Sequence, residues 1–249
     1  MEKKSLMIYL TILFCCQSFG QNNDLKKLTL IGKVRSLRES SYQPAEKDGK
    51  VQNGNLEFYY YNTFDNRGNK IDDIRYAPDG KPEKKYMYKY DSLGRRIEQD
   101  QYSSDGKLIR EITYKYDENG NLLEDDSFTA EGKFDKKFTY KHDDQGNIIE
   151  DNSFDADNKL LKKFTYKYDG AGNKIENSRY SSQGILDKTL TYKYDDKGYV
   201  IEETVTSPDG SRITSTYLYE FDKRDNWIKK IKYSEKKPIN IIERQIEYY

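Results

Sequence analysis

One eleven-residue motif recurs along this chain at a fixed spacing. Its clean copies read YKYDSLGRRIE, YKYDENGNLLE, YKHDDQGNIIE, YKYDGAGNKIE and YKYDDKGYVIE, and begin at Tyr88, Tyr114, Tyr140, Tyr166 and Tyr192. The step is 26 residues, and imperfect copies start at Asn62 and, after a step of 27, at Tyr219. Such a period indicates a repeat array in which each unit packs mainly on its neighbours. The repeat predicts the architecture of the chain but says little about its function.

Each unit combines two strand patterns with two turn patterns. With units numbered from the first tyrosine, positions 25, 1 and 3 are apolar or aromatic and alternate with polar residues, as in 164–168, which predicts a strand with one packed face. Asp91 and Gly94 predict a tight turn, because the carboxylate caps backbone N–H groups and glycine takes positive φ. A second turn carries Asp105-Gly106, and Asn158 replaces that glycine in one copy, where it tolerates the left-handed region.

These patterns predict an all-β fold. We expect an antiparallel meander of about 16 strands built from 26-residue β-hairpin repeats, forming a curled open sheet or a shell segment, because no connection is long enough for a parallel crossover. Residues 28–39 should add a strand, and a longer loop at 40–55 should lead into a strand at 56–64. The expected segments are a signal peptide (1–20), an N-terminal capping strand and loop (21–61), the repeats (62–225) and a C-terminal capping hairpin (226–249).

One detail leaves two alternatives. The aliphatic residue at position 10 and the aromatic residue at position 15, such as Ile97 and Tyr102, are an odd number of residues apart, so a regular strand would point them to opposite faces. Either a β-bulge lies between them or the sheet carries aromatic residues on both faces. We favour the bulge.

The first twenty residues predict export. A basic start precedes an apolar run at 5–16 that is too short to span a membrane, and small residues place cleavage after Gly20. A retained anchor is the alternative; a lipid anchor fits poorly, because neither Cys15 nor Cys16 follows a small residue. Cleavage would remove both cysteines, so the mature chain would have no disulfide and no thiolate site. We expect the periplasm, the outer-membrane surface or the extracellular space.

The charge balance argues against nucleic acid as a partner. The full chain has 43 basic and 43 acidic residues, and loss of the leader would leave 41 and 42, a formal charge of −1. Lysine and glutamate are interspersed without blocks of one sign, as on solvated strand faces. Such a chain has no net field to steer it to nucleic acid.

The motif Tyr-x-Tyr-Asp-x-x-Gly-x-x-Ile, as in YKYDSLGRRI and YKYDGAGNKI, resembles the YD repeat of the Rhs and teneurin families over roughly residues 56–233. The resemblance implies β-hairpins that spiral into a hollow shell, and such repeats are linked to carbohydrate binding and cell-surface contact. The array here is short, with about seven units, and no toxin-like domain follows it. The chain also resembles small exported repeat proteins of Bacteroidetes, whose role is generally unknown.

No catalytic or metal constellation stands out. His142 is the only histidine, and it occupies a slot that holds tyrosine in every other clean unit, which indicates packing. Acidic residues such as Asp143, Asp144 and Glu150 are explained by the recurring turn, which supplies one fixed aspartate rather than a set of calcium ligands. We therefore predict a non-enzymatic protein without a cofactor, a metal or catalytic residues.

The tyrosines are the sharpest candidates for function. Their structural role would be packing between hairpins. The functional alternative is stacking on sugar rings or on a surface protein. Trp227, the single tryptophan, either caps the array or lies at a binding edge. The candidate binding aromatics are Tyr88, Tyr90, Tyr114, Tyr116, Tyr166, Tyr168, Tyr192, Tyr194 and Trp227.

We predict a protein that binds a glycan or protein partner at the cell envelope through its aromatic face; the alternative is a structural spacer without a ligand. About 16 strands and a terminal Tyr249 also fit an outer-membrane barrel. However, position 23, on the face of the aromatics, is often basic (Lys84, Arg110, Lys136), and a charge in a lipid-facing band costs roughly 2–4 kcal/mol. We therefore expect no integral membrane insertion after signal cleavage.

Overall fold

The computed structural model describes residues 23–249, so the expected signal peptide lies outside the described residues. No helix in the described part is both long and apolar enough to cross a membrane. The elements are α1 (Asp24–Lys27), β1 (Val34–Lys47), β2 (Lys50–Phe64), β3 (Lys70–Tyr76), β4 (Pro82–Tyr90), β5 (Arg96–Ser103), β6 (Leu108–Tyr116), β7 (Leu122–Thr129), β8 (Phe134–His142), β9 (Ile148–Asp155), β10 (Leu160–Tyr168), β11 (Lys174–Ser181), β12 (Leu186–Tyr194), β13 (Val200–Thr206), β14 (Arg212–Phe221), β15 (Trp227–Ser234) and β16 (Lys237–Tyr248).

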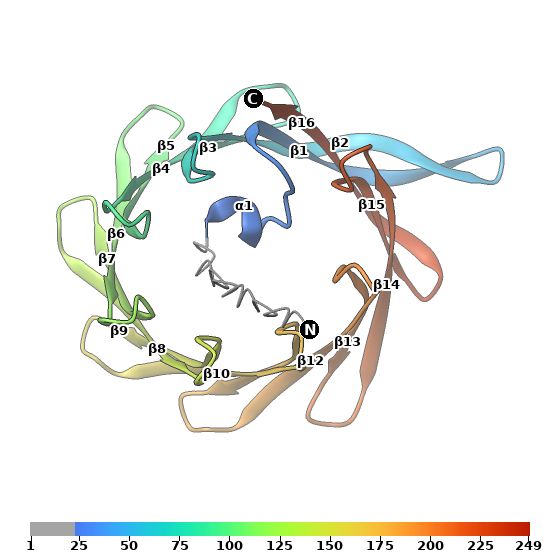
Figure 1. Cartoon of the computed structure of the whole chain (residues 1–249). Coiled ribbons are helices and arrows are strands. Elements are labelled where there is room, and N and C mark those ends of the chain that lie inside the picture. Colours follow the sequence, from blue (N-terminus) through green and yellow to red (C-terminus); the bar gives the residue numbers. More distant parts are fainter. Residues whose placement is uncertain (1–22) are drawn as a thin grey trace, which may run out of the picture.

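The all-β antiparallel meander of 16 strands is confirmed, but the expected open sheet is wrong, because the strands form a closed barrel (Figure 1). β1 pairs with β2 on one side and with β16 on the other, in a register that places Leu37 opposite Ile246 and Ser41 opposite Ile242. The repeat could not predict this closure, since β1 and β16 lie outside its clean copies. Closure removes the two unpaired edges that an open meander would expose.

The turns follow the residues that the repeat places in them. At one end of the barrel, Asp91 accepts hydrogen bonds from the backbone N–H groups of Leu93 and Arg95 at 3.0 and 2.9 Å, and Gly94 adopts a φ of 76°. At the other end, Asn158 takes the position of glycine with a φ of 60°. Both turn predictions are confirmed.

The expected bulge is also present. Tyr90 pairs with Arg96 and Lys89 pairs with Glu98, so the ladder skips Ile97, the residue at position 10. The bulge shifts the alternation by one residue. Aromatic residues nevertheless occur on both faces, because Tyr102 pairs with Lys85 on the face opposite to that of Tyr90.

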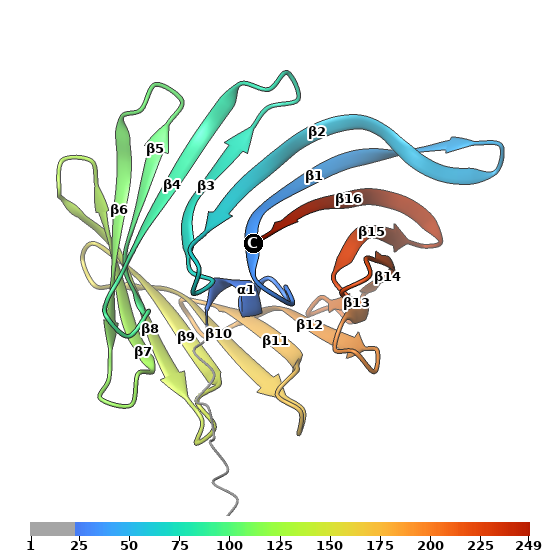
Figure 2. The same ribbon diagram turned by 45° about the horizontal axis from the view of Figure 1, so that its top comes forward.

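The loop expected at 40–55 is instead a continuation of two strands. β1 and β2 run on to a turn at Asp48-Gly49, where both residues have positive φ. Pro44 is accommodated because the ladder shifts register between Tyr42 and Pro44. This hairpin extends beyond its neighbours (Figure 2).

The N-terminal segment lies within the ring of strands (Figure 1). It contains α1, whose first turn is capped by Asn23 through a hydrogen bond from the Lys26 N–H group. Its apolar side chains form the buried cluster of Leu25, Leu30, Val34, Leu37 and Phe64. Apolar burial therefore fixes this segment against the inner wall at the β1–β2 side.

Candidate functional site

The tyrosine ladder lines the inside of the barrel. The Tyr90 hydroxyl donates to the Asp24 carboxylate at 2.5 Å, and Asp24 belongs to α1 inside the ring. Alternate residues of a strand share a face, so Tyr88 lies on the inner wall with Tyr90, whereas Lys89 lies on the outer wall. All eight candidate tyrosines occupy these two repeat positions and are half-buried: Tyr88, Tyr90, Tyr114, Tyr116, Tyr166, Tyr168, Tyr192 and Tyr194.

Tyrosines at position 1 bond to a polar side chain of the preceding unit. Tyr88 donates to Asp73 at 3.1 Å, Tyr114 to Gln99 at 3.2 Å, and Tyr166 to Asp151. The pKa of Tyr88 and that of Tyr166 are raised, first by burial and then by the neighbouring carboxylates. These phenols stay protonated and act as donors at neutral pH.

Tyrosines at position 3 bond instead to a backbone carbonyl twenty residues earlier. Tyr116 donates to Arg96 O at 2.8 Å, Tyr168 to Ile148 O at 2.7 Å, and Tyr194 to Lys174 O at 2.6 Å. Burial is the first cause that raises the pKa of Tyr116 to about 12. The hydroxyls therefore tie neighbouring hairpins together, while the rings stay partly open to the lumen.

Trp227 differs from the ladder tyrosines because it is buried. Its side chain is 4% exposed, and the Arg244 guanidinium lies 3.4 Å from the centre of its ring. Tyr219 packs edge-on against it at 6.0 Å between ring centroids. Among the two roles expected from sequence, the packing agrees with the capping role.

Asp24 of α1 is bound by three groups of the inner wall. Its side chain receives Arg96 Nη2 at 2.7 Å, the Tyr90 hydroxyl at 2.5 Å and the Lys70 N–H group at 3.0 Å, and the residue is 4% exposed. Burial raises its pKa, but Arg96, Tyr90 and the Lys70 amide together hold the pKa below the usual value. Asp24 is therefore ionised at neutral pH and fixes α1 to strands β3 to β5.

A cavity of about 570 Å³ opens beside Asp24. Its lining includes Arg96, Tyr90, Tyr116 and His142, with amide side chains from the turns at the same end of the barrel. A second cavity of about 350 Å³ lies further along the wall, between Leu28 and the side chains of Tyr86 and Tyr88. The lumen thus presents aromatic rings, amides and charged groups to any molecule that enters it.

The outer wall carries a row of ion pairs, one from each clean unit. The lysine at position 2 meets the glutamate at position 11 because the two residues are paired across adjacent strands. The pairs are Lys89–Glu98, Lys115–Glu124 (2.6 Å), Lys141–Glu150 (2.8 Å), Lys167–Glu176 (3.0 Å) and Lys193–Glu202 (2.8 Å).

Lys84, Arg110 and Lys136 lie on the face of the tyrosines, as expected, but the argument that placed these charges in a lipid-facing band was wrong. These residues share their face with the tyrosines, and that face is the inner wall. The charges that matter for contact with lipid are those of the outer ion pairs.

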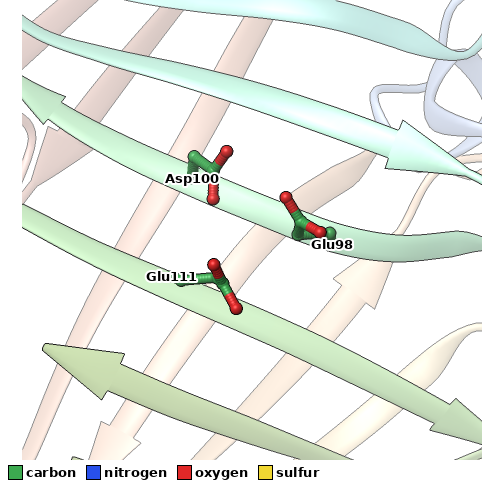
Figure 3. A group of neighbouring side chains, drawn as sticks. All are labelled: Glu98, Asp100 and Glu111. Carbon is green, nitrogen blue, oxygen red and sulfur yellow. The ribbon is translucent and has the colours of Figure 1, made fainter. Parts of the chain in front are cut away.

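Three carboxylates lie close together on the outer wall (Figure 3). Carboxylate oxygens of Glu98, Asp100 and Glu111 lie within 4.8 Å of one another on β5 and β6. Glu98 is ion-paired with Lys89, and the Tyr102 hydroxyl donates to Asp100 at 3.2 Å. Half-buried carboxylates with these partners carry no metal assignment.

Sequence reasoning missed the charged residues of the lumen. Asp24 lies 72 residues from Arg96 in the sequence, and no local pattern links them. Asp125 had a usable signal, because position 12 of successive units is always polar although it belongs to the tyrosine face: Asp73, Gln99, Asp125, Asp151, Asn177 and Glu203.

No protein-family model matches the chain, and no curated protein matches it. A porin-like protein from Bacteroides uniformis has a similar structure, with a TM-score of 0.58 and 10% identity over 86% of this chain and 98% of that one. That likeness shows the fold alone.

More distant similarities carry no argument here. They include a porin-like protein from Bacteroides vulgatus (TM-score 0.44, 13% identity, 88% of this chain and 99% of that one) and the Tc holotoxin pore of Photorhabdus luminescens (TM-score 0.34, 18% identity, 83% and 11%). The YD-repeat resemblance thus stays a resemblance of the hairpin motif.

Proposed function

We propose that this chain is a non-enzymatic, exported barrel of the cell envelope that binds a glycan in its tyrosine-lined lumen. The observation that carries the proposal is the inner wall itself, where half-buried tyrosine rings recur every 26 residues beside carboxylates, amides and a cavity of about 570 Å³. Ligand sites combine such apolar surface with a few fixed polar groups. The YD-repeat resemblance, with its link to carbohydrate binding, points the same way.

We further propose that the outer wall faces water. Lys137 and Lys163, near the middle of β8 and β10, pair with glutamates on that wall at 3.4 and 2.6 Å. Each lysine at the centre of a lipid-facing band would cost roughly 2–4 kcal/mol. The outer ion pairs therefore support a barrel that is not embedded in lipid, whereas the name porin-like belongs to the similar protein.

A structural spacer without a ligand is the second candidate. The observation that favours it is that the ladder hydroxyls are already bonded within the barrel, as for Tyr116 and Tyr168. Stacking on a sugar uses the ring face rather than the hydroxyl, so these bonds do not prevent it. The two candidates differ in whether the exposed ring surface contributes to affinity.

The test is a glycan array with the purified protein, followed by calorimetric titration of the strongest ligand. The triple variant Tyr116→Ala, Tyr168→Ala, Tyr194→Ala should lose about 1.5–4.5 kcal/mol of binding free energy at about 0.5–1.5 kcal/mol per ring. The matched triple Phe variant removes the hydroxyls but keeps the rings, and should retain most of the affinity. No glycan hit, or equal affinity of a folded Ala triple, would leave the spacer as the better account.

A further inference from the structure

The inner wall binds one carboxylate, and that carboxylate belongs to Asp24 of the same chain. Groups from three strands converge on the side chain of Asp24: Arg96 Nη2 at 2.7 Å, the Lys70 N–H group at 3.0 Å and the Tyr90 hydroxyl at 2.5 Å. The single proton of that hydroxyl is shared between Asp24 and the Lys70 carbonyl oxygen at 2.8 Å. Charge-assisted bonds of this kind are among the strongest that a wall can offer to an anion.

Arg96 is held in place independently of Asp24. Its Nη1 donates to Gln99 at 3.2 Å, and its guanidinium lies 4.1 Å from the centre of the Tyr88 ring. Its Nε is buried and has no hydrogen-bond partner among the described residues. If Asp24 were removed, the Arg96 guanidinium would therefore stay in position on the wall, and its Nε would still be able to donate a hydrogen bond.

The repeat makes this site unique along the ladder. The residue at position 9 of successive units is Lys70, Arg96, Leu122, Ile148, Lys174 and Val200, so the described units supply one arginine at that place. Only this unit offers the planar fork that matches a carboxylate. The site also opens on the cavity of about 570 Å³, where Tyr90 and Tyr116 present ring surface.

We propose that the wall around Arg96 is the subsite for the carboxylate of an acidic saccharide, and that Asp24 occupies it as an internal competitor. This inference rests on the proposed function and adds the ligand class and its regulation. The sugar ring would lie in the cavity against the tyrosines while its carboxylate replaces that of Asp24. The competition lowers the apparent affinity of the resting protein, because only the fraction with a vacant subsite can bind.

The experiment compares the exported protein purified from the periplasm of an expression host with two variants, Asp24→Ala and the matched control Lys26→Ala. Lys26 is an exposed residue of the same short helix. The probes are galacturonic acid, galactose and acetate, titrated at neutral pH and constant ionic strength. Asp24→Ala should bind galacturonic acid about tenfold more tightly than the wild-type chain or Lys26→Ala, as expected when an occupant that fills the site nine-tenths of the time is removed.

Adding Arg96→Gln to Asp24→Ala should abolish the gain in affinity for galacturonic acid. Equal binding of galacturonic acid to all variants, or a gain that survives Arg96→Gln, would overturn the carboxylate subsite even if galactose binding upheld the proposed function. Binding of acetate alone would uphold the subsite and refute the glycan. If Asp24→Ala does not fold, Asp24→Asn takes its place, because it keeps an acceptor for Tyr90 while removing the charge from Arg96, and the same outcomes apply.

Discussion

Replacing Asp125 by asparagine is expected to stabilise the barrel at neutral pH. Asp125 lies on β7 with its hydrogen-bond partner, the Tyr140 hydroxyl, at 2.5 Å, and it is 8% exposed. Burial, followed by the charges of Asp126 and Asp151, raises its pKa to about 6, and the Tyr140 bond opposes part of that rise. The ordinary value is 3.8, so the folded protein holds this proton to a higher pH than the unfolded chain does.

The sign follows from linkage. A carboxyl whose pKa is raised by folding contributes most favourably below pH 4, and that contribution is lost as the pH rises through about 6. A rise of roughly two units corresponds to at most about 3 kcal/mol at neutral pH. Asparagine does not titrate and can accept the bond from Tyr140, and the same slot holds Gln99 and Asn177 in other units. Asp125→Asn should therefore gain about 1–3 kcal/mol at pH 7.5 and almost nothing at pH 4.

Urea unfolding followed by circular dichroism at both pH values measures the effect. Asp73→Asn is the matched control at the same repeat position. Asp73 is paired with Lys70 at 3.1 Å, so its replacement should cost about 1–3 kcal/mol at pH 7.5. The reasoning would be refuted if Asp125→Asn destabilised the protein at pH 7.5, or if its effect were the same at both pH values.

Three further results are expected. Gly172→Ala should cost about 1–2 kcal/mol in urea unfolding because Gly172 has a φ of 83°, whereas Gly170→Ala in the same turn should be close to neutral, since neither Cβ would meet an atom within 4 Å and Gly170 lacks a positive φ. Trp227→Ala should lower stability by about 3–5 kcal/mol, and an unchanged melting temperature would contradict its packing role. The purified chain should stay monodisperse without detergent in size-exclusion chromatography; aggregation that only detergent reverses would contradict a water-facing outer wall.

The repeat predicted the turns and the bulge, which depend on local chemistry. Turn residues such as Asp91 and Asn158 have the conformations expected of them, and the odd spacing between Ile97 and Tyr102 correctly indicated a bulge. These features depend on neighbouring residues alone, and a single unit contains all the information needed.

Closure and the assignment of faces depend on the whole ring, so one unit could not predict them. The β1–β16 contact joins residues about two hundred positions apart, and Asp24 reaches Arg96 from outside the repeats. The alternation predicted two faces, but it did not say which one would be enclosed. The lysine at position 2 and the glutamate at position 11 contained a usable signal, because a recurring opposite-charge pair is typical of a solvated face.

Closure of the barrel is the central claim, since the lumen exists only if β1 meets β16. Arg38 and Gln245 are paired across that contact and share the lining of an outer-wall pocket. Directly opposite Cβ atoms lie about 4.5–5.5 Å apart, close enough for a disulfide after a small adjustment. The variant Arg38→Cys, Gln245→Cys is made in a chain of residues 21–249, which lacks Cys15 and Cys16. It should form an intramolecular disulfide under mild oxidation, visible as a mobility shift that reductant reverses. The control Arg38→Cys, Thr204→Cys, four strand spacings or about 19 Å apart around the ring, should keep free thiols. Free thiols or only intermolecular bonds in the first variant would contradict a closed barrel.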